Sequence, residues 1–197
     1  MPRITEERRT ERREQILAGA RRCFAEYGYE GATVVRLEKA TGLSRGAIFN
    51  YFSSKDDLFL ELAWRDDERF IRLWLAKGWE AAIREVAAED ADWLGVYLEL
   101  TRKIRTDPGF RRAHEKRSDP ERARELIAQV ASEQEQGLFR EDLPAEQIAG
   151  FISLVANGMV VQMAAGEPIR AFDALIEFIR SAVAPPARQP ARPRRSG

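Results

Sequence analysis

Apolar residues recur at intervals of three and four along most of the chain, and this helical period constrains the fold more than any other feature. Near the N-terminus the apolar stripe consists of Ile16, Ala20, Phe24 and Tyr27, and Gly28 follows as a stop. The strict alternation of apolar and polar residues that marks half-buried strands is nearly absent. The sequence therefore predicts an all-α protein.

Capping residues, prolines and glycines divide the sequence into further helices. Thr33 caps a short helix over 33–40, Ser44 caps a second over 45–52, and a long helix runs from Lys55 to about Lys77 with Leu58, Phe59, Leu62, Phe70 and Leu73 inside. The remaining predicted helices cover 79–88, 93–105, 108–136 with a kink or restart at 118–120, 144–165 and 168–184. These elements indicate a head over residues 1–54, a helical body over 55–184 and a disordered tail over 185–197 that is rich in proline and arginine.

The two short helices and the turn at Gly42 between them form a helix-turn-helix. An α-helix fits the DNA major groove, and the small residues Gly46 and Ala47 would let the backbone of the second helix approach the bases. Arg45 offers a fork of donors that matches a guanine edge, and Asn50 offers both a donor and an acceptor. This pattern predicts sequence-specific contact with double-stranded DNA.

Charge is unevenly distributed although the formal net charge is zero. Residues 1–55 carry 11 basic and 7 acidic side chains, residues 56–187 carry 17 and 25, and the last ten residues add four arginines. A basic head suits contact with phosphates, and Tyr51 and Lys55 are placed where a hydroxyl and an ammonium could hold phosphates on either side.

The runs FAEYGYEGAT at 24–33 and TGLSRGAIFNYFSSK at 41–55 resemble the signature of the TetR family of bacterial regulators. The resemblance implies a repressor that binds a palindromic operator as a homodimer, with C-terminal helices that dimerise and bind a small-molecule effector. Glu38, where the family usually has alanine, and Phe49, where tyrosine is commoner, depart from the pattern. The implied DNA-binding residues are Thr33, Ser44, Arg45, Gly46, Ala47, Phe49, Asn50, Tyr51 and Lys55.

A narrower resemblance, to the aconitase-repressor branch of that family, rests on LEKATG at 37–42, SRGAIF at 44–49 and RTDP at 105–108. It implies control of a citric-acid-cycle gene and an anionic effector such as citrate with a divalent metal; no other cofactor is expected. A regulator of an efflux or lipid-metabolism gene with a hydrophobic effector is the alternative.

An effector pocket is expected among the helices over 55–77, 93–105, 108–136 and 144–165. The polar candidates to line it are Glu99, Arg102, His114, Asn157 and Gln162. A competing, apolar lining would consist of Trp64, Trp74, Trp93 and Phe110.

The last two helices are the predicted dimer interface. The helix over 144–165 is apolar on more than one face, which a single core contact does not require. Asn157 on that helix fits the pocket and the interface equally well.

Other function classes find little support in the sequence. Nucleophile-elbow, zinc-protease and P-loop motifs are absent, so an enzyme is not expected, and a helical enzyme or interaction module is a remote alternative. His114 is the only histidine and cannot build a zinc site by itself, and Cys23 fits a small buried hydrophobe. The polar N-terminus and the lack of an apolar run near 18 residues predict a cytoplasmic protein with no membrane contact.

Overall fold

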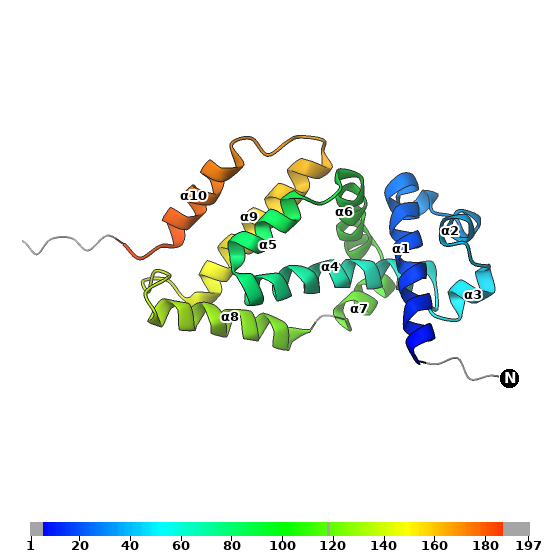
Figure 1. Ribbon diagram of the computed structural model, residues 1–197, viewed down its shortest axis with the longest axis horizontal. Coiled ribbons are helices and arrows are strands. Elements are labelled where there is room, and N and C mark those ends of the chain that lie inside the picture. The colour runs from blue at the N-terminus through cyan, green and yellow to red at the C-terminus, as the bar shows by residue number, and fades with distance from the viewer. Residues whose placement is uncertain (1–5, 118, 187–197) are drawn as a thin grey trace, which may run out of the picture.

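The computed structural model describes residues 6–117 and 119–186, and every regular element in those two segments is an α-helix. The all-α prediction is confirmed, and the first three helices form a head at one end of the molecule that α4 joins to the body (Figure 1). In chain order the helices are α1 (Glu6–Gly31), α2 (Val34–Thr41), α3 (Arg45–Phe49), α4 (Lys55–Lys77), α5 (Trp79–Ala87), α6 (Ala91–Thr106), α7 (Pro108–Glu115), α8 (Pro120–Glu135), α9 (Ala145–Ala164) and α10 (Phe172–Val183).

Short polar side chains begin the helices of the head as the sequence indicated. Thr33 Oγ1 accepts the N–H of Arg36 at 3.4 Å, and Ser44 Oγ accepts the N–H of Ala47 at 3.3 Å. Gly42 ends α2 with a φ of 71°, in the left-handed region that favours glycine. The helix-turn-helix therefore has capped boundaries on both sides of its turn.

Two details of the head differ from the prediction. Tyr27 does not complete the buried stripe: its side chain is 37% exposed, because α1 kinks at Gly28 (φ 67°) and Tyr29 enters the core instead. The third helix ends at Phe49 rather than near Phe52, because the chain turns at residues 50 and 51.

The body also confirms most predicted boundaries. The predicted restart at 118–120 separates α7 from α8, which Asp119 caps. The final helix begins at Phe172 rather than Pro168, because Ala171 has a φ of 49° that no right-handed helix can include. Leu58, Phe59 and Leu62 are buried as predicted, whereas Phe70 and Leu73 are only partly buried.

Two clusters of buried apolar side chains hold the helices together. The first joins α1, α2 and α3 to the N-terminal half of α4 and to α6 and α7, and it includes Cys23, whose thiol pKa is raised by burial. The second joins the C-terminal half of α4 to α5, α8, α9 and α10. Because α4 contributes to both clusters, it is the continuous structural link between head and body.

Helix α9 corrects one sequence expectation. Its length and mean hydropathy of 1.4 make it the one helix, among the described residues, that is long and apolar enough to cross a membrane. Alanine, glycine and a few polar residues interrupt the largest apolar side chains of this segment, so no such run was expected from the sequence. In this fold α9 instead packs against α5, α6 and α8.

Candidate nucleic-acid interface and cavity

The surface of α3 and of the residue that caps its C-terminus carries the residues predicted to read bases. Arg45, Gly46 and Asn50 are exposed, and Ala47 is half-buried. A β-carbon added to Gly46 would meet nothing within 4 Å, so this side of the helix is open to an approaching molecule. Ile48, on the opposite face, is fully buried and anchors α3 to the head.

Two aromatic residues of the predicted interface have packing roles. Phe49 and Tyr51 are half-buried and contact the first apolar cluster. Each can present only part of its ring or its hydroxyl to DNA. Base reading by Phe49 and phosphate contact by Tyr51 remain predictions.

Glu38 fixes the N-terminus of α3 by a contact that the sequence analysis missed. Its Oε1 accepts the backbone N–H of Arg45 at 2.6 Å, next to the cap that Ser44 provides. In the sequence, Glu38 stands out only as a departure from the family pattern. The sequence held one signal for this contact with Arg45, which is an acidic residue one turn before Gly42 of the helix-turn-helix.

Lys55 is held by the head itself. Its Nζ donates to the backbone oxygen of Tyr29 at 2.8 Å and lies 4.2 Å from the centroid of the Tyr29 ring. Burial lowers the pKa of Lys55. Thr33, another predicted phosphate ligand, already uses its hydroxyl as the cap of α2. Both can contact DNA only in addition to these roles, so their contacts with phosphate remain predictions.

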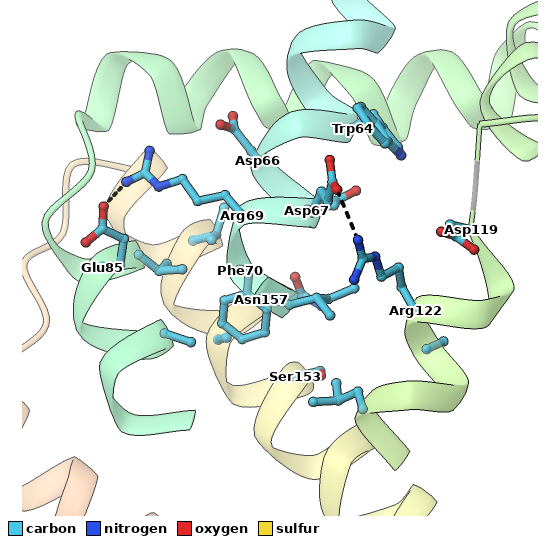
Figure 2. A pocket seen from close by; sticks show the side chains of 18 of the residues that line it. Trp64, Asp66, Asp67, Arg69, Phe70, Glu85, Asp119, Arg122, Ser153 and Asn157 are labelled. Atoms are coloured by element: carbon cyan, nitrogen blue, oxygen red, sulfur yellow. Dashed lines mark hydrogen bonds and ion pairs between the residues drawn. The ribbon is translucent and has the colours of Figure 1, made fainter. Parts of the chain in front are cut away.

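The body contains a cavity of about 560 Å³ lined by residues of α4, α5, α6, α7, α8 and α9. Figure 2 shows Phe70, Asn157 and Ser153 among the lining residues, together with the charged side chains of Asp66, Arg69, Asp119 and Arg122. Apolar lining residues include Leu60, Trp64, Phe70, Trp93, Leu126 and Ile127. The charged and titratable lining residues are Asp66, Asp67, Glu68, Glu85, Glu89, Asp119, Glu146, Arg69, Arg117, Arg122 and His114.

The three arginines of the cavity all pair with carboxylates of the protein. Arg69 pairs with Glu85 and lies 3.6 Å from Glu89, and Arg122 lies 3.8 Å from Glu68. Arg117 pairs with Asp57 at the start of α4. A ligand anion would therefore compete with existing ion pairs for these guanidinium groups.

The structure brings together only part of the predicted effector set. His114 and Asn157 line the cavity, as do Trp64 and Trp93 of the apolar alternative. Trp74 and Phe110 are instead buried in the two apolar clusters. Arg69 on α4, Arg117 in the turn after α7 and Arg122 on α8 were missed, because no local sequence pattern reveals which sides of these segments face one another.

The other three predicted effector residues lie outside the cavity lining. Glu99 Oε2 accepts the backbone N–H of Tyr29 at 2.9 Å and so joins α6 to α1. Arg102 is exposed on α6, and the side chain of Gln162 donates to the backbone oxygen of Pro168 at 3.2 Å.

Comparison with known proteins identifies relatives of the head and of the whole chain. Residues 16–62 match the family model described as bacterial regulatory proteins, tetR family. The chain is 40% identical over 185 residues to the HTH-type transcriptional repressor Rv1474c of Mycobacterium tuberculosis, covering 93% of this chain and 98% of that protein. It is 36% identical over 188 residues to the HTH-type transcriptional repressor AcnR of Corynebacterium diphtheriae, covering 93% and 97%. Among solved structures, Salmonella enterica GusR superposes with a TM-score of 0.71 at 20% identity, covering 93% of this chain and 99% of that one.

Proposed function

The chain belongs to the TetR family of helix-turn-helix transcriptional repressors, and from this premise we propose that it represses an aconitase or other citric-acid-cycle gene. In this proposal two copies bind a near-palindromic operator, each through α3, and a small-molecule effector held in the cavity changes operator affinity. Regulators of this family are typically cytoplasmic, and we propose the same location here.

One observation carries the proposal: similarity to named repressors extends over the body as well as the head. A match confined to residues 16–62 would support DNA binding alone. Identity of 36–40% across both parts supports a shared regulatory role. The relatives are repressors and not enzymes, which agrees with the expectation that this chain has no catalytic site.

The proposed homodimer is supported by the apolar side chains that α9 and α10 leave exposed. Leu154 is 72% exposed, and Phe178 is 71% exposed. Phe151 and Val161 on α9 are also exposed, whereas Ile152 on the same helix is buried in the body. A helix that is apolar on its packed and its unpacked faces is typical of an interface with a second copy.

For the effector we propose a small polycarboxylate that enters together with a divalent metal ion. Arg69 and Arg122 offer guanidinium groups suited to carboxylates, but seven acidic side chains share the cavity lining with three arginines. A free tricarboxylate would be repelled by that surplus of negative charge, which a divalent ion on the ligand would reduce. No group of three or more metal-ligating side chains is found in the described part of the chain, so the ion would arrive as part of the complex.

The apolar effector of the alternative reading also has support in the cavity. Trp64, Phe70 and Trp93 line it, together with leucine and isoleucine side chains. A thermal-shift screen separates the two classes. Stabilisation by citrate with Mg²⁺ would support the polycarboxylate, and stabilisation by apolar compounds alone would reject it.

The experiment that tests the proposed function is a gel shift with DNA from upstream of the aconitase gene and with unrelated DNA of equal length. Specific retention that persists when salt is raised would support the proposal, because base contacts lose less affinity to salt than phosphate contacts do. Equal retention of both DNAs at both salt concentrations would reject it.

A further inference from the structure

We propose that Arg21 of α1 couples the cavity to the DNA-binding head, by sharing with the cavity the side chains of Asp66, Glu89 and Trp93. The inference rests on the proposed function and adds to it a residue that positions the head according to the state of the cavity wall. Asp66 lies on α4, Glu89 in the turn after α5 and Trp93 on α6, so one head residue reaches three parts of the body.

The Arg21 guanidinium is bound on several sides at once. Its Nη1 donates to both carboxylate oxygens of Asp66, at 2.9 and 3.0 Å, and its Nη2 lies 2.7 Å from Glu89 Oε2. The guanidinium carbon lies 4.1 Å from the centroid of the Trp93 ring, and the indole N–H of Trp93 donates to Asp66 at 2.7 Å. The hydrogen bonds come from Nη1, whereas Nη2 makes an ion pair with Glu89, and the planar guanidinium lies over the indole ring, a combination that suits arginine.

This network is partly shielded from solvent. The Arg21, Asp66 and Glu89 side chains are 27%, 23% and 21% exposed, and Trp93 is 2% exposed. Burial raises the pKa of Asp66, against the opposing effects of Arg21 and Trp93. The ionised form of Asp66 is therefore stabilised by Arg21 and Trp93. Loss of one member of the network should change the interactions of the other members.

Asp66, Glu89 and Trp93 also line the cavity, whereas Arg21 is not part of that lining. Arg69, which does line the cavity, lies 3.6 Å from Glu89 and pairs with Glu85. Glu89 thus lies between a guanidinium of the head and a guanidinium of the cavity. A ligand that binds Arg69 or approaches Asp66 changes the charge that Arg21 faces.

Helix α1 passes such a change to the helix-turn-helix, because it is fastened to the end of α2. Gln15 donates to the backbone oxygen of Thr41 and Arg22 to that of Ala40, both at 2.9 Å. The helices are so close at Gly19 that an added β-carbon would lie 2.7 Å from the Thr41 Cα. A displacement of α1 at Arg21 must therefore move α2 and, through the Glu38 contact, α3.

A double-mutant cycle on operator affinity tests this coupling without any ligand. Arg21→Gln and Asp66→Asn should each change the operator Kd, by about 2- to 30-fold, and the double variant should change it no more than the larger single effect. Unchanged single variants, or effects that multiply independently, would overturn the proposal. Thermal unfolding checks that each variant is folded. If Arg21→Gln is not, Arg21→Lys with Glu89→Gln forms a second cycle on the Arg21–Glu89 pair, with the same outcomes expected.

Glu14→Gln is the matched control. Glu14 pairs with Arg65 at 2.7 Å and so also joins α1 to α4, but neither residue lines the cavity. Its effect on the operator Kd should multiply independently with that of Asp66→Asn. Coupling as large as that of Arg21 would mean that any ion pair between α1 and α4 suffices, and would overturn the specific role of Arg21.

A second measurement adds citrate with equimolar MgCl₂ as the probe. If the probe shifts the operator Kd of the wild type, the shift should be smaller in Arg21→Gln, and an equal shift would overturn the proposal. If the wild type does not respond, the proposed effector class fails, and the ligand-free cycle still decides the role of Arg21.

Discussion

At the scale of single residues, Arg45 combines an exposed side chain with a fixed backbone. Its N–H is bound by Glu38, and its guanidinium extends from the first position of α3. A side chain at this position reaches the base edges when the helix enters the major groove. The contribution of Arg45 to operator specificity should therefore come from its side chain and not from the stability of the head.

Arg45→Ala should weaken specific operator binding by about 1–3 kcal/mol while binding to unrelated DNA is nearly unchanged. Fluorescence anisotropy with both DNAs at the same salt concentration measures the two affinities. An equal loss on both DNAs would contradict base reading and would make Arg45 a phosphate ligand.

The Glu38 contact predicts different outcomes for two substitutions of one residue. Glu38→Ala removes the acceptor for the Arg45 N–H and should weaken operator binding about 3- to 10-fold, as expected for a lost cap. Glu38→Gln keeps an acceptor oxygen and removes a negative charge near the DNA, so it should bind at least as tightly as the wild type. Operator titrations of both variants decide the matter, and equal affinities would exclude a positioning role.

At the scale of elements, the contact between α1 and α4 contains a buried carboxylate with two arginine partners. Glu61 is 7% exposed and lies 2.8 Å from Arg13 of α1 and 3.0 Å from Arg65 of its own helix. Burial alone would raise the pKa of Glu61, but the hydrogen bonds and charges of both arginines outweigh it and hold the pKa below its ordinary value. The ionised form therefore stabilises the folded state.

This lowered pKa predicts a loss of stability in acid. The contribution of Glu61 is fully present above the pKa of the unfolded chain, near 4.5, and is lost as the pH falls through the lower pKa of the folded state. Glu61→Gln should reduce the free energy of unfolding by about 1–3 kcal/mol at pH 7, and by less as the pH falls below about 4. Denaturant unfolding of the wild type and of Glu61→Gln, at pH 7 and at a pH below about 4, tests this. A difference that is constant with pH would show that Glu61 acts by packing and not by charge.

The elements themselves could largely be predicted from local sequence. Thr33, Gly42 and Ser44 mark boundaries by short-range hydrogen bonds and backbone conformation, which depend on few neighbours. The break at Gly28 was predicted as a helix stop. That Tyr29 rather than Tyr27 enters the core was not predicted, because it depends on the direction of the backbone after the kink.

Contacts between distant elements could not be predicted in this way. Arg21 and Asp66 are 45 positions apart, and Tyr29 and Glu99 are 70 apart. Of the candidate effector residues, His114 and Asn157 lie in the cavity lining, whereas Glu99 has a different partner, and effector binding by any of them remains a prediction. Which side of a helix faces a cavity depends on how six helices pack, and a single sequence does not contain that information in any local pattern.

At the scale of the whole molecule, the proposed dimer would link the exposed apolar side chains of α9 and α10 to DNA binding. A palindromic operator presents two half-sites, so a dimer gains the contacts of two heads while one copy gains those of a single head. The apolar surface at Leu154 and Phe178 should thus determine operator affinity although it lies far from α3 along the chain.

If the proposed dimer forms through this surface, Leu154→Glu and Phe178→Glu should each convert it to a monomer, because a carboxylate placed inside an apolar interface loses its hydration without gaining a partner. Light scattering at micromolar concentration measures the mass, and anisotropy measures binding to the full operator and to a half-site. We expect the variants to bind the full operator about as weakly as the wild type binds the half-site.

Leu138→Glu is the control, because Leu138 is 61% exposed but lies in the loop between α8 and α9. If the Leu154 and Phe178 variants remain dimers, the interface lies elsewhere. If they are monomers that still bind the full operator at wild-type affinity, dimerisation is not what makes the operator site strong.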